Sequence, residues 1–304
     1  MTDTRINICG VNFKNPIITA SGTFGFGDEY GEYVDLSEYG GFAAKGLTRR
    51  PREGNKPPRI AETPSGILNS VGLQNPGVEY FSQNIMPKLS KIDTNVIANI
   101  SGNTIEEYCE MAEILSDTDV AMIELNVSCP NVKHGGLAFG TDPKVVEELT
   151  SEVKKHCEKP MIVKLSPNVT SIQDIAKAAE AGGADILSLI NTLLGMSIDI
   201  HSRKPILANN MGGLSGPAVK PVAVRMVYQV KQAVRLPIIG IGGVMNGADV
   251  IEFMLAGASL VAVGTGLFVD PAMILPIKKE IQAYMEKYNI EKLTDIIGGV
   301  TINQ

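Results

Sequence analysis

The segment from 121 to 136, AMIELNVSCPNVKHGG, places a single thiol directly after an apolar run. Cys129 follows the run 121–127 and precedes Pro130 and a glycine-bearing loop. A lone cysteine often packs as a small hydrophobic group. At the end of a strand, however, a thiol is within reach of a ligand, and one whose pKa lies near the working pH acts as a general base or nucleophile. The placement predicts that Cys129 is catalytic.

Two lysines stand at the ends of other apolar runs. Lys45 and Lys164 each follow several apolar residues. An ammonium group in such a place costs free energy unless an anion or another partner meets it. A single lysine there would extend its charged end to solvent, but two of them near one site predict an anionic cofactor or substrate.

Four asparagines occur near the same kinds of position: Asn69, Asn99, Asn126 and Asn191. Each amide offers donors and an acceptor, which is what a planar ring with alternating C=O and N–H groups requires. Each one alone also suits a turn or a helix cap. Together they favour a ring-binding site.

Glycine-rich segments follow the last two apolar runs. Gly242 and Gly243 lie in GIGGVMNG, and Gly264 and Thr265 lie in VGTGLF. Backbone N–H groups before a helix can hold a phosphate. Glycines also form simple tight turns, but two such segments on neighbouring strands favour a phosphate site.

The elements that would position these residues recur along the chain. Short, continuously apolar runs predict strands at 16–20, 41–45, 95–100, 121–127, 160–165, 184–190, 237–241 and 259–263. Such runs are typical of a parallel sheet covered on both faces. Segments with helical period separate them at 104–116, 142–157, 171–183 and 217–234. Eight such units predict one α/β domain over 1–304, a (β/α)8 TIM barrel.

Two long segments do not fit the bare repeat. Residues 49–77 and 192–216 are expected to be irregular insertions after the second and sixth strands, on the face where barrel enzymes place their active sites. The alternative fold is an open, doubly wound sheet. Neither SGTFGFGDEYG nor GIGGVMNG has the G-x-G-x-x-G spacing of a dinucleotide-binding sheet.

Composition narrows the class of protein. The chain has 304 residues, of which 44% are hydrophobic and 20% charged, and its formal net charge is −6. This charge argues against nucleic acid as a partner. No stretch reads as a membrane span or a targeting signal, and the scattered cysteines form no metal-ligand spacing, so we expect a reduced, cytoplasmic protein without a bound metal.

The motifs together resemble the catalytic subunits of class 1 dihydroorotate dehydrogenases over essentially the whole chain. The matching segments include NPIITASGTFGFG, ANISG, ELNVSCPNVKHGGLAFGTDP, VKLSPN, GGLSGPA, GIGGV and VGTGLF. The resemblance implies a TIM barrel with FMN at its C-terminal mouth, which oxidises dihydroorotate to orotate in pyrimidine synthesis. GFGDEY, GLQNPG and KHGGLAFGTDP resemble type 1B. That type implies a homodimeric core in a heterotetramer, with a partner subunit that carries FAD and an iron–sulfur cluster and passes electrons to NAD.

The resemblance also implies roles for individual residues. Cys129 is the base that removes the C5 proton of dihydroorotate, while hydride leaves C6 for the flavin. Implied substrate ligands are Lys45, Asn69, Ser70, Val71, Gly72, Leu73, Asn126, Asn191 and Thr192. Implied FMN ligands are Ser21, Lys45, Gly46, Asn99, Asn126, Lys164, Ile190, Gly216, Gly242, Gly243, Gly264 and Thr265.

Two other functions stay open at this point. A dihydrouridine synthase also combines an FMN barrel with a cysteine, but it binds tRNA, and the acidic net charge counts against that. A phosphate-binding barrel without catalytic activity is the second alternative, because a fold alone does not establish a reaction.

Overall fold

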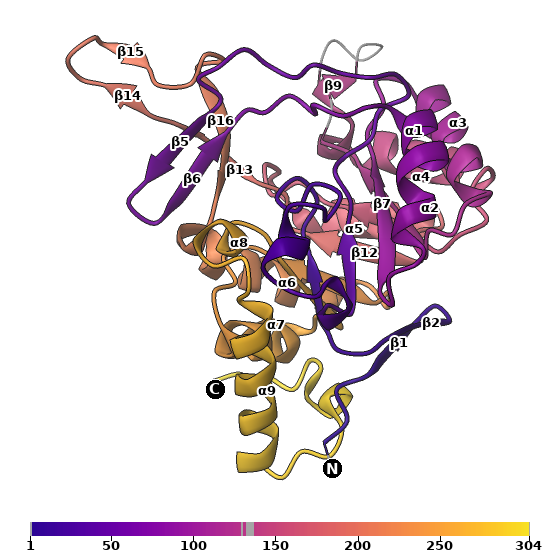
Figure 1. Ribbon diagram of the computed structural model, residues 1–304, viewed down its shortest axis with the longest axis vertical. Helices are drawn as coiled ribbons and strands as arrows, with labels where there is room; N and C mark the ends of the chain where they lie inside the picture. The colour runs from indigo at the N-terminus through magenta and orange to yellow at the C-terminus, as the bar shows by residue number, and fades with distance from the viewer. Residues whose placement is uncertain (1, 129, 132–136, 304) are drawn as a thin grey trace.

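The computed structural model describes residues 2–128, 130–131 and 137–303, and eight parallel strands at its centre close into a barrel (Figure 1). In barrel order the strands are β3 (Ile17–Thr19), β4 (Gly41–Ala43), β7 (Asn95–Ile100), β8 (Met122–Asn126), β11 (Met161–Lys164), β12 (Ile186–Leu189), β17 (Ile238–Ile241) and β18 (Leu260–Val263). Each overlaps one of the eight predicted runs. Because β18 pairs with β3, the barrel is confirmed and the open-sheet alternative is wrong.

Helices follow the barrel strands and cover their outer faces. The longer ones are α3 (Ile105–Ser116), α4 (Pro143–Lys154), α5 (Ile172–Ala181), α6 (Lys220–Ala233), α7 (Gly247–Ala256) and α9 (Ile274–Lys287). Short pieces are α1 (Val78–Tyr80), α2 (Met86–Leu89) and α8 (Gly266–Val269). All four predicted helices are present, although 217–234 begins with a 3-10 turn at Pro217–Val219. Within the described residues, every helix is too short or too polar to cross a bilayer.

Local sequence explains where several helices begin. The side chains of Thr104, Ser171 and Asn246 accept hydrogen bonds from backbone N–H groups in the first turns of α3, α5 and α7. Such caps satisfy donors that the helix itself leaves free. The strand-to-helix connections are therefore fixed by short polar segments of the chain.

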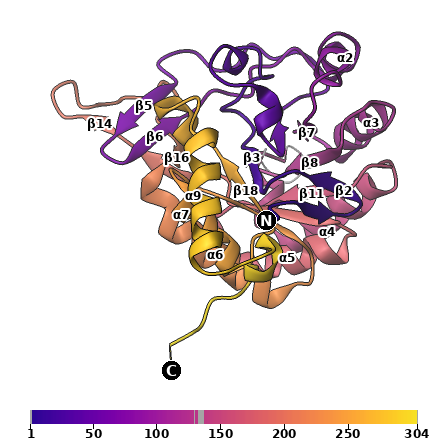
Figure 2. The ribbon, with the colours of Figure 1, turned by 60° about the horizontal axis from the view of Figure 1, so that its bottom comes forward.

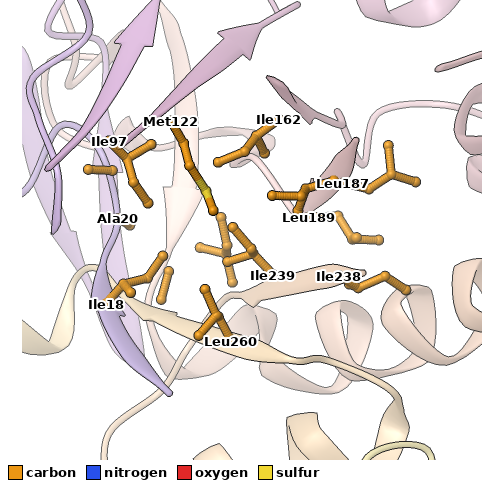
Figure 3. Close-up of a cluster of buried hydrophobic side chains, with 14 of the residues drawn as sticks. Ile18, Ala20, Ile97, Met122, Ile162, Leu187, Leu189, Ile238, Ile239 and Leu260 are labelled. Atoms are coloured by element: carbon orange, nitrogen blue, oxygen red, sulfur yellow. The ribbon is translucent and has the colours of Figure 1, made fainter. Parts of the chain in front are cut away.

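The core lies between the strands and the helices and, inside the barrel, below the C-terminal ends of the strands. Figure 3 shows part of this cluster, with labelled side chains that include Ile97, Met122, Ile162 and Leu260. These four side chains are at most 1% exposed. The continuous apolar character of the strands arises because a parallel barrel strand is buried on both faces.

The two insertions are more regular than expected, because parts of both fold together into one antiparallel sheet, while 49–59 and 70–77 have little regular structure. Its strand order is β13 (Leu193–Met196), β16 (Met211–Ser215), β6 (Gly66–Asn69) and β5 (Ile60–Thr63). In Figure 1 this sheet stands beside the barrel, with the hairpin of β14 (Ile198–Asp199) and β15 (Lys204–Pro205) at its outer end. β16 joins the insertions by pairing with both β13 and β6.

Smaller pieces complete the chain. The hairpin of β1 (Ile6–Ile8) and β2 (Val11–Phe13) leads into β3 and lies near the N-terminus in Figure 2. Its Ile6, Ile8 and Phe13 side chains join the main core. β9 (Pro130–Asn131) pairs with β10 (Leu137–Ala138) after the fourth barrel strand. The remaining 3-10 turns are η1 (Tyr30–Glu32), η2 (Leu36–Glu38), η5 (Phe139–Thr141) and η7 (Leu293–Ile296), and η3 (Phe81–Ile85) is a π-helical segment that joins α1 to α2.

Candidate active site

A cavity of about 820 Å³ lies at the C-terminal ends of the barrel strands, partly covered by the insertion sheet. Every site residue predicted from the sequence that falls within the described residues lines it: Ser21, Lys45, Gly46, Asn69, Ser70, Val71, Gly72, Leu73, Asn99, Asn126, Lys164, Ile190, Asn191, Thr192, Gly216, Gly242, Gly243, Gly264 and Thr265. Cys129, the predicted base, lies outside the described residues. The structure thus brings together residues that are far apart in the sequence.

Side chains that point into the barrel change from apolar to polar toward the C-terminal ends of the strands. Met122, Glu124 and Asn126 share one face of β8, because successive strand residues point to opposite faces. The Glu124 carboxylate reaches Ser188 on β12, which is not a neighbour of β8 in the barrel. This face is therefore the barrel interior. Going toward the mouth, its side chains change from apolar to charged to amide.

Lys164, the last residue of β11, is 5% exposed and already has a carboxylate partner. Its Nζ lies 3.7 Å from Glu124 Oε2 and donates to Ser21 Oγ at 3.2 Å. Lys164 thus has a partner within the protein, which is one of the two ways of offsetting its charge that the sequence left open. Sequence reasoning missed Glu124 because it reads as one polar residue within an apolar run.

Lys45 has no such compensation. Within the described residues no carboxylate lies within 4 Å of its ammonium group, although Lys45 lines the cavity. Burial, and to a lesser extent the nearby Arg59, lowers the pKa of Lys45. A negatively charged ligand in the cavity would offset both effects, as the sequence led us to expect.

Amides and hydroxyls form a connected group on the β8 and β12 side of the mouth. Asn191 Nδ2 donates to Asn126 Oδ1 at 3.1 Å and to Ser128 Oγ at 2.8 Å. Thr192 N donates to Asn191 Oδ1 at 2.8 Å. From the insertion sheet, Asn69 Nδ2 donates to Gly213 O at 3.3 Å. These bonds fix the amide orientations and so determine which side of the site offers donors.

Glycines form the opposite rim, next to β17 and β18. Gly216 and Gly243 adopt φ values of 100° and 72°, and a Cβ on Gly243 would lie 2.8 Å from Gly216 O. At Gly264, by contrast, a Cβ would make ordinary contacts, the nearest being Ala20 Cβ at 3.5 Å. Its lack of a side chain therefore leaves space in the cavity. Thr265 Oγ1 donates to Ser215 Oγ at 2.8 Å beside it.

Two cavity residues carry buried polar atoms with no hydrogen-bond partner among the described residues. These atoms are Asn99 Oδ1 and Ser70 Oγ. Buried polar atoms are nearly always paired, so such atoms in the wall of a cavity suit a ligand that brings its own polar groups. With the glycine rim and two lysines, this wall fits a planar, anionic, phosphorylated ligand such as FMN.

The site also contains residues that the sequence did not single out. Glu124 lies behind Lys164 and does not line the cavity, whereas Thr23, Arg52, Ser128 and Phe268 do. Arg52 and Phe268 lie several residues beyond the ends of the runs 41–45 and 259–263, which is why a search of strand ends did not single them out. Their positions depend on how the insertion and α8 pack around the mouth.

The three described cysteines are poor candidates for the base. Partial desolvation and the nearby Asp185 raise the pKa of the thiol of Cys9, although this residue is exposed, and burial raises that of Cys157. Burial with nearby acidic residues raises the pKa of Cys109 to about 11. A thiol with a raised pKa is mostly protonated at neutral pH, so it makes a poor base or nucleophile. None of these three described thiols is therefore suited to act as the base.

Comparison with known proteins adds an independent observation. A family model described as dihydroorotate dehydrogenase matches residues 4–285. Relatives named "Dihydroorotate dehydrogenase B (NAD(+)), catalytic subunit" include proteins of Alkaliphilus metalliredigens (61% identical, covering 97% of this chain and 98% of the relative), Alkaliphilus oremlandii (59%, 96% and 97%) and Bacteroides fragilis (52%, 99% and 100%). Since the matches extend over nearly all of the barrel and its mouth, this chain belongs to the dihydroorotate dehydrogenase family.

Proposed function

We propose that this protein is the FMN-binding catalytic subunit of an NAD-linked, type 1B dihydroorotate dehydrogenase, which oxidises (S)-dihydroorotate to orotate in pyrimidine biosynthesis. The observation that carries the proposal is the single cavity that gathers the lysines, amides and glycines of the family motifs. Family membership supports the same reading.

The substrate would occupy the side of the cavity nearest the amides. Asn69, Asn126, Asn191 and Thr192 offer donors and acceptors for the pyrimidine ring and its carboxylate, helped by the backbone of Ser70–Leu73. Lys45 lies in the same wall and offsets the substrate's negative charge. The fixed Asn191–Asn126 hydrogen bond orients the ring before reaction.

The cofactor would lie between the barrel interior and the glycine rim. Ser21, Lys45, Gly46, Asn99, Asn126, Lys164, Ile190 and Gly216 would hold the ring system, and Gly242, Gly243, Gly264 and Thr265 the phosphate. FMN, when bound, supplies the acceptor for the hydride that leaves C6 of the substrate. The Lys164 ammonium stabilises negative charge next to it.

Proton removal is assigned to Cys129. In this proposal its thiolate takes the proton from C5 of dihydroorotate. The three described thiols have raised pKa values, which leaves Cys129 as the remaining cysteine for this role. The cavity wall and the insertion sheet would keep bulk water from the reacting carbons.

Electrons would leave through a second protein. The relatives' names describe a catalytic subunit of an NAD(+)-type enzyme. We infer a partner subunit that carries FAD and an iron–sulfur cluster, bound to a homodimeric core of this chain in a cytoplasmic heterotetramer. Without that partner, the chain should reduce artificial acceptors but not NAD.

An anaerobic visible spectrum tests the function directly. The purified chain should be yellow, and dihydroorotate should bleach the flavin absorbance, whereas orotate added at the same concentration should perturb the spectrum without bleaching it. A yellow protein that dihydroorotate leaves oxidised would contradict the substrate. A colourless protein that does not take up added FMN would contradict the cofactor and restore the non-catalytic alternative.

A further inference from the structure

A buried carboxylate connects four barrel strands beneath the cavity. Glu124, on β8, is 3% exposed. Its Oε1 accepts a hydrogen bond from Ser188 Oγ on β12 at 2.7 Å, and its Oε2 accepts one from Asn99 Nδ2 on β7 at 2.5 Å. The same Oε2 lies 3.7 Å from Lys164 Nζ on β11.

These contacts leave the carboxylate little freedom. Two charge-assisted hydrogen bonds hold its oxygens, and each donor comes from a different strand. Lys164 is the one cation among the described residues within ion-pair distance of Glu124. Burying a carboxylate is costly unless it is paired and hydrogen-bonded, and Glu124 meets both conditions.

The position of Lys164 depends on this carboxylate. Only 6% of its side chain is exposed, so solvent does little to stabilise its charge. Apart from Glu124, its described hydrogen bond is with the uncharged Ser21 Oγ at 3.2 Å. Without the Glu124 carboxylate, the hydrogen bond to Ser21 Oγ would be the one hydrogen bond or ion pair left among the described residues to hold the end of the Lys164 side chain.

We propose that Glu124 is a positioning residue that holds the Lys164 side chain in place at the cavity wall. By taking the Asn99 Nδ2 group it also orients that amide, which leaves Oδ1 unpaired beside Gly46. The inference rests on the proposed function, because it concerns how the protein holds a cation against FMN. Glu124 itself touches neither ligand in this scheme and acts through Lys164.

Replacement of Glu124 by Gln tests the inference, with the midpoint potential of bound FMN as the readout. At pH 7.5 the midpoint potential should fall by about 30 mV. For a two-electron couple this corresponds to an about tenfold lower ratio of reduced to oxidised cofactor at a given potential. Lys164→Met should shift the potential in the same direction. In the Lys164→Met background, Glu124→Gln should add less than a threefold further change, because coupled residues are not additive.

Matched variants separate this role from simple stabilisation. Asp185→Asn removes another carboxylate that pairs with a lysine, Lys154, at 2.5 Å, but at the opposite end of the barrel, where Asp185 accepts from Met161 N. It should lower the unfolding temperature and leave the potential unchanged. Glu124→Asp keeps the charge but withdraws it by one methylene, so a smaller shift of the same sign is expected even if the Gln variant fails to fold.

The outcomes are distinct. An unchanged potential in both Glu124 variants would overturn the proposal and leave Glu124 a structural group. A shift to higher potential, or one that persists fully in the Lys164→Met background, would overturn it as well, because Glu124 would then act through its own charge. Failure of the proposed function looks different, since the wild-type chain itself would then bind no FMN or fail to bleach with dihydroorotate.

Discussion

At the residue scale, the two cavity lysines differ in how their charges are compensated. Lys164 has Glu124 within 3.7 Å, whereas Lys45 has no carboxylate within 4 Å among the described residues and has a lowered pKa. The charge of Lys164 is offset within the protein, whereas the charge of Lys45 would be offset only by a ligand. A substrate carboxylate would therefore gain more from Lys45 than from Lys164.

The most direct prediction at this scale concerns Cys129. Cys129→Ala should leave FMN bound and orotate affinity nearly intact, yet slow flavin reduction by dihydroorotate about 10²-fold or more, because the variant lacks the general base. Stopped-flow absorbance under anaerobic conditions measures the rate. Cys9→Ala is the control, since Cys9 is exposed in the N-terminal hairpin turn and should react as wild type. Reduction of the Cys129 variant at the wild-type rate would exclude this residue as the base.

At the scale of elements, the site depends on strands that end at one mouth and on a sheet built from two insertions. β16 pairs with β6, so Asn69 lies opposite Gly213 in the register, and Gly213 is packed against Thr192. The insertions thus bring a residue of 49–77 next to one of 192–216. Small residues along this contact allow the two backbones to approach closely.

Gly66 tests whether this contact matters. A Cβ on Gly66 would overlap the Ser215 carbonyl oxygen and lie 3.4 Å from Gly216 Cα. Gly66→Ala should therefore cost about 1–3 kcal/mol of unfolding free energy through overpacking, and weaken binding of FMN by displacing Gly216. Thermal unfolding and a flavin titration measure the two effects.

The matched control for Gly66 is Gly31→Ala. Gly31 is exposed, and a Cβ there would meet nothing within 4 Å. This variant should match the wild type in both measurements. If Gly66→Ala also matched the wild type, the insertion sheet could shift without consequence for the site.

At the scale of the whole molecule, barrel closure brings the last strand next to the first. β18 pairs with β3, so the glycine rim after β18 meets Ser21 and Thr23 after β3. A ligand that fills the mouth would contact the beginning, middle and end of the chain. Such a ligand should stabilise the entire fold, because it binds only when the barrel is closed.

Comparison of FMN with riboflavin, which lacks the phosphate, measures how much the phosphate contributes to the stabilisation of the fold by the bound flavin. FMN at about 100 times its dissociation constant should contribute about 2.7 kcal/mol and raise the unfolding temperature of the flavin-free chain by about 4 °C. Riboflavin at the same concentration should raise it less. Gly264→Asp places a negative charge in the cavity wall, where a Cβ would make only ordinary contacts, so it should remove the advantage of FMN. Equal shifts for both flavins in the wild type would contradict the phosphate site.

The sequence by itself determined the barrel and most of the cavity wall. The strand runs are continuously apolar because each strand is buried on both faces, and this signal is local in the chain. Since parallel strands end at one mouth, residues at strand ends such as Lys164, Asn126 and Gly264 could be assigned to one site before their distances were known.

Only the tertiary structure decided what those residues contact. Glu124 finds Asn99 and Ser188 at sequence separations of 25 and 64 residues, and no local pattern marks such partners. The insertion sheet could not be predicted from the sequence, because it depends on the pairing of β16 with β6. These two strands belong to different insertions, and no local pattern indicates that they pair. Local propensity fixes which segments form elements, whereas long-range packing fixes which polar groups meet inside them.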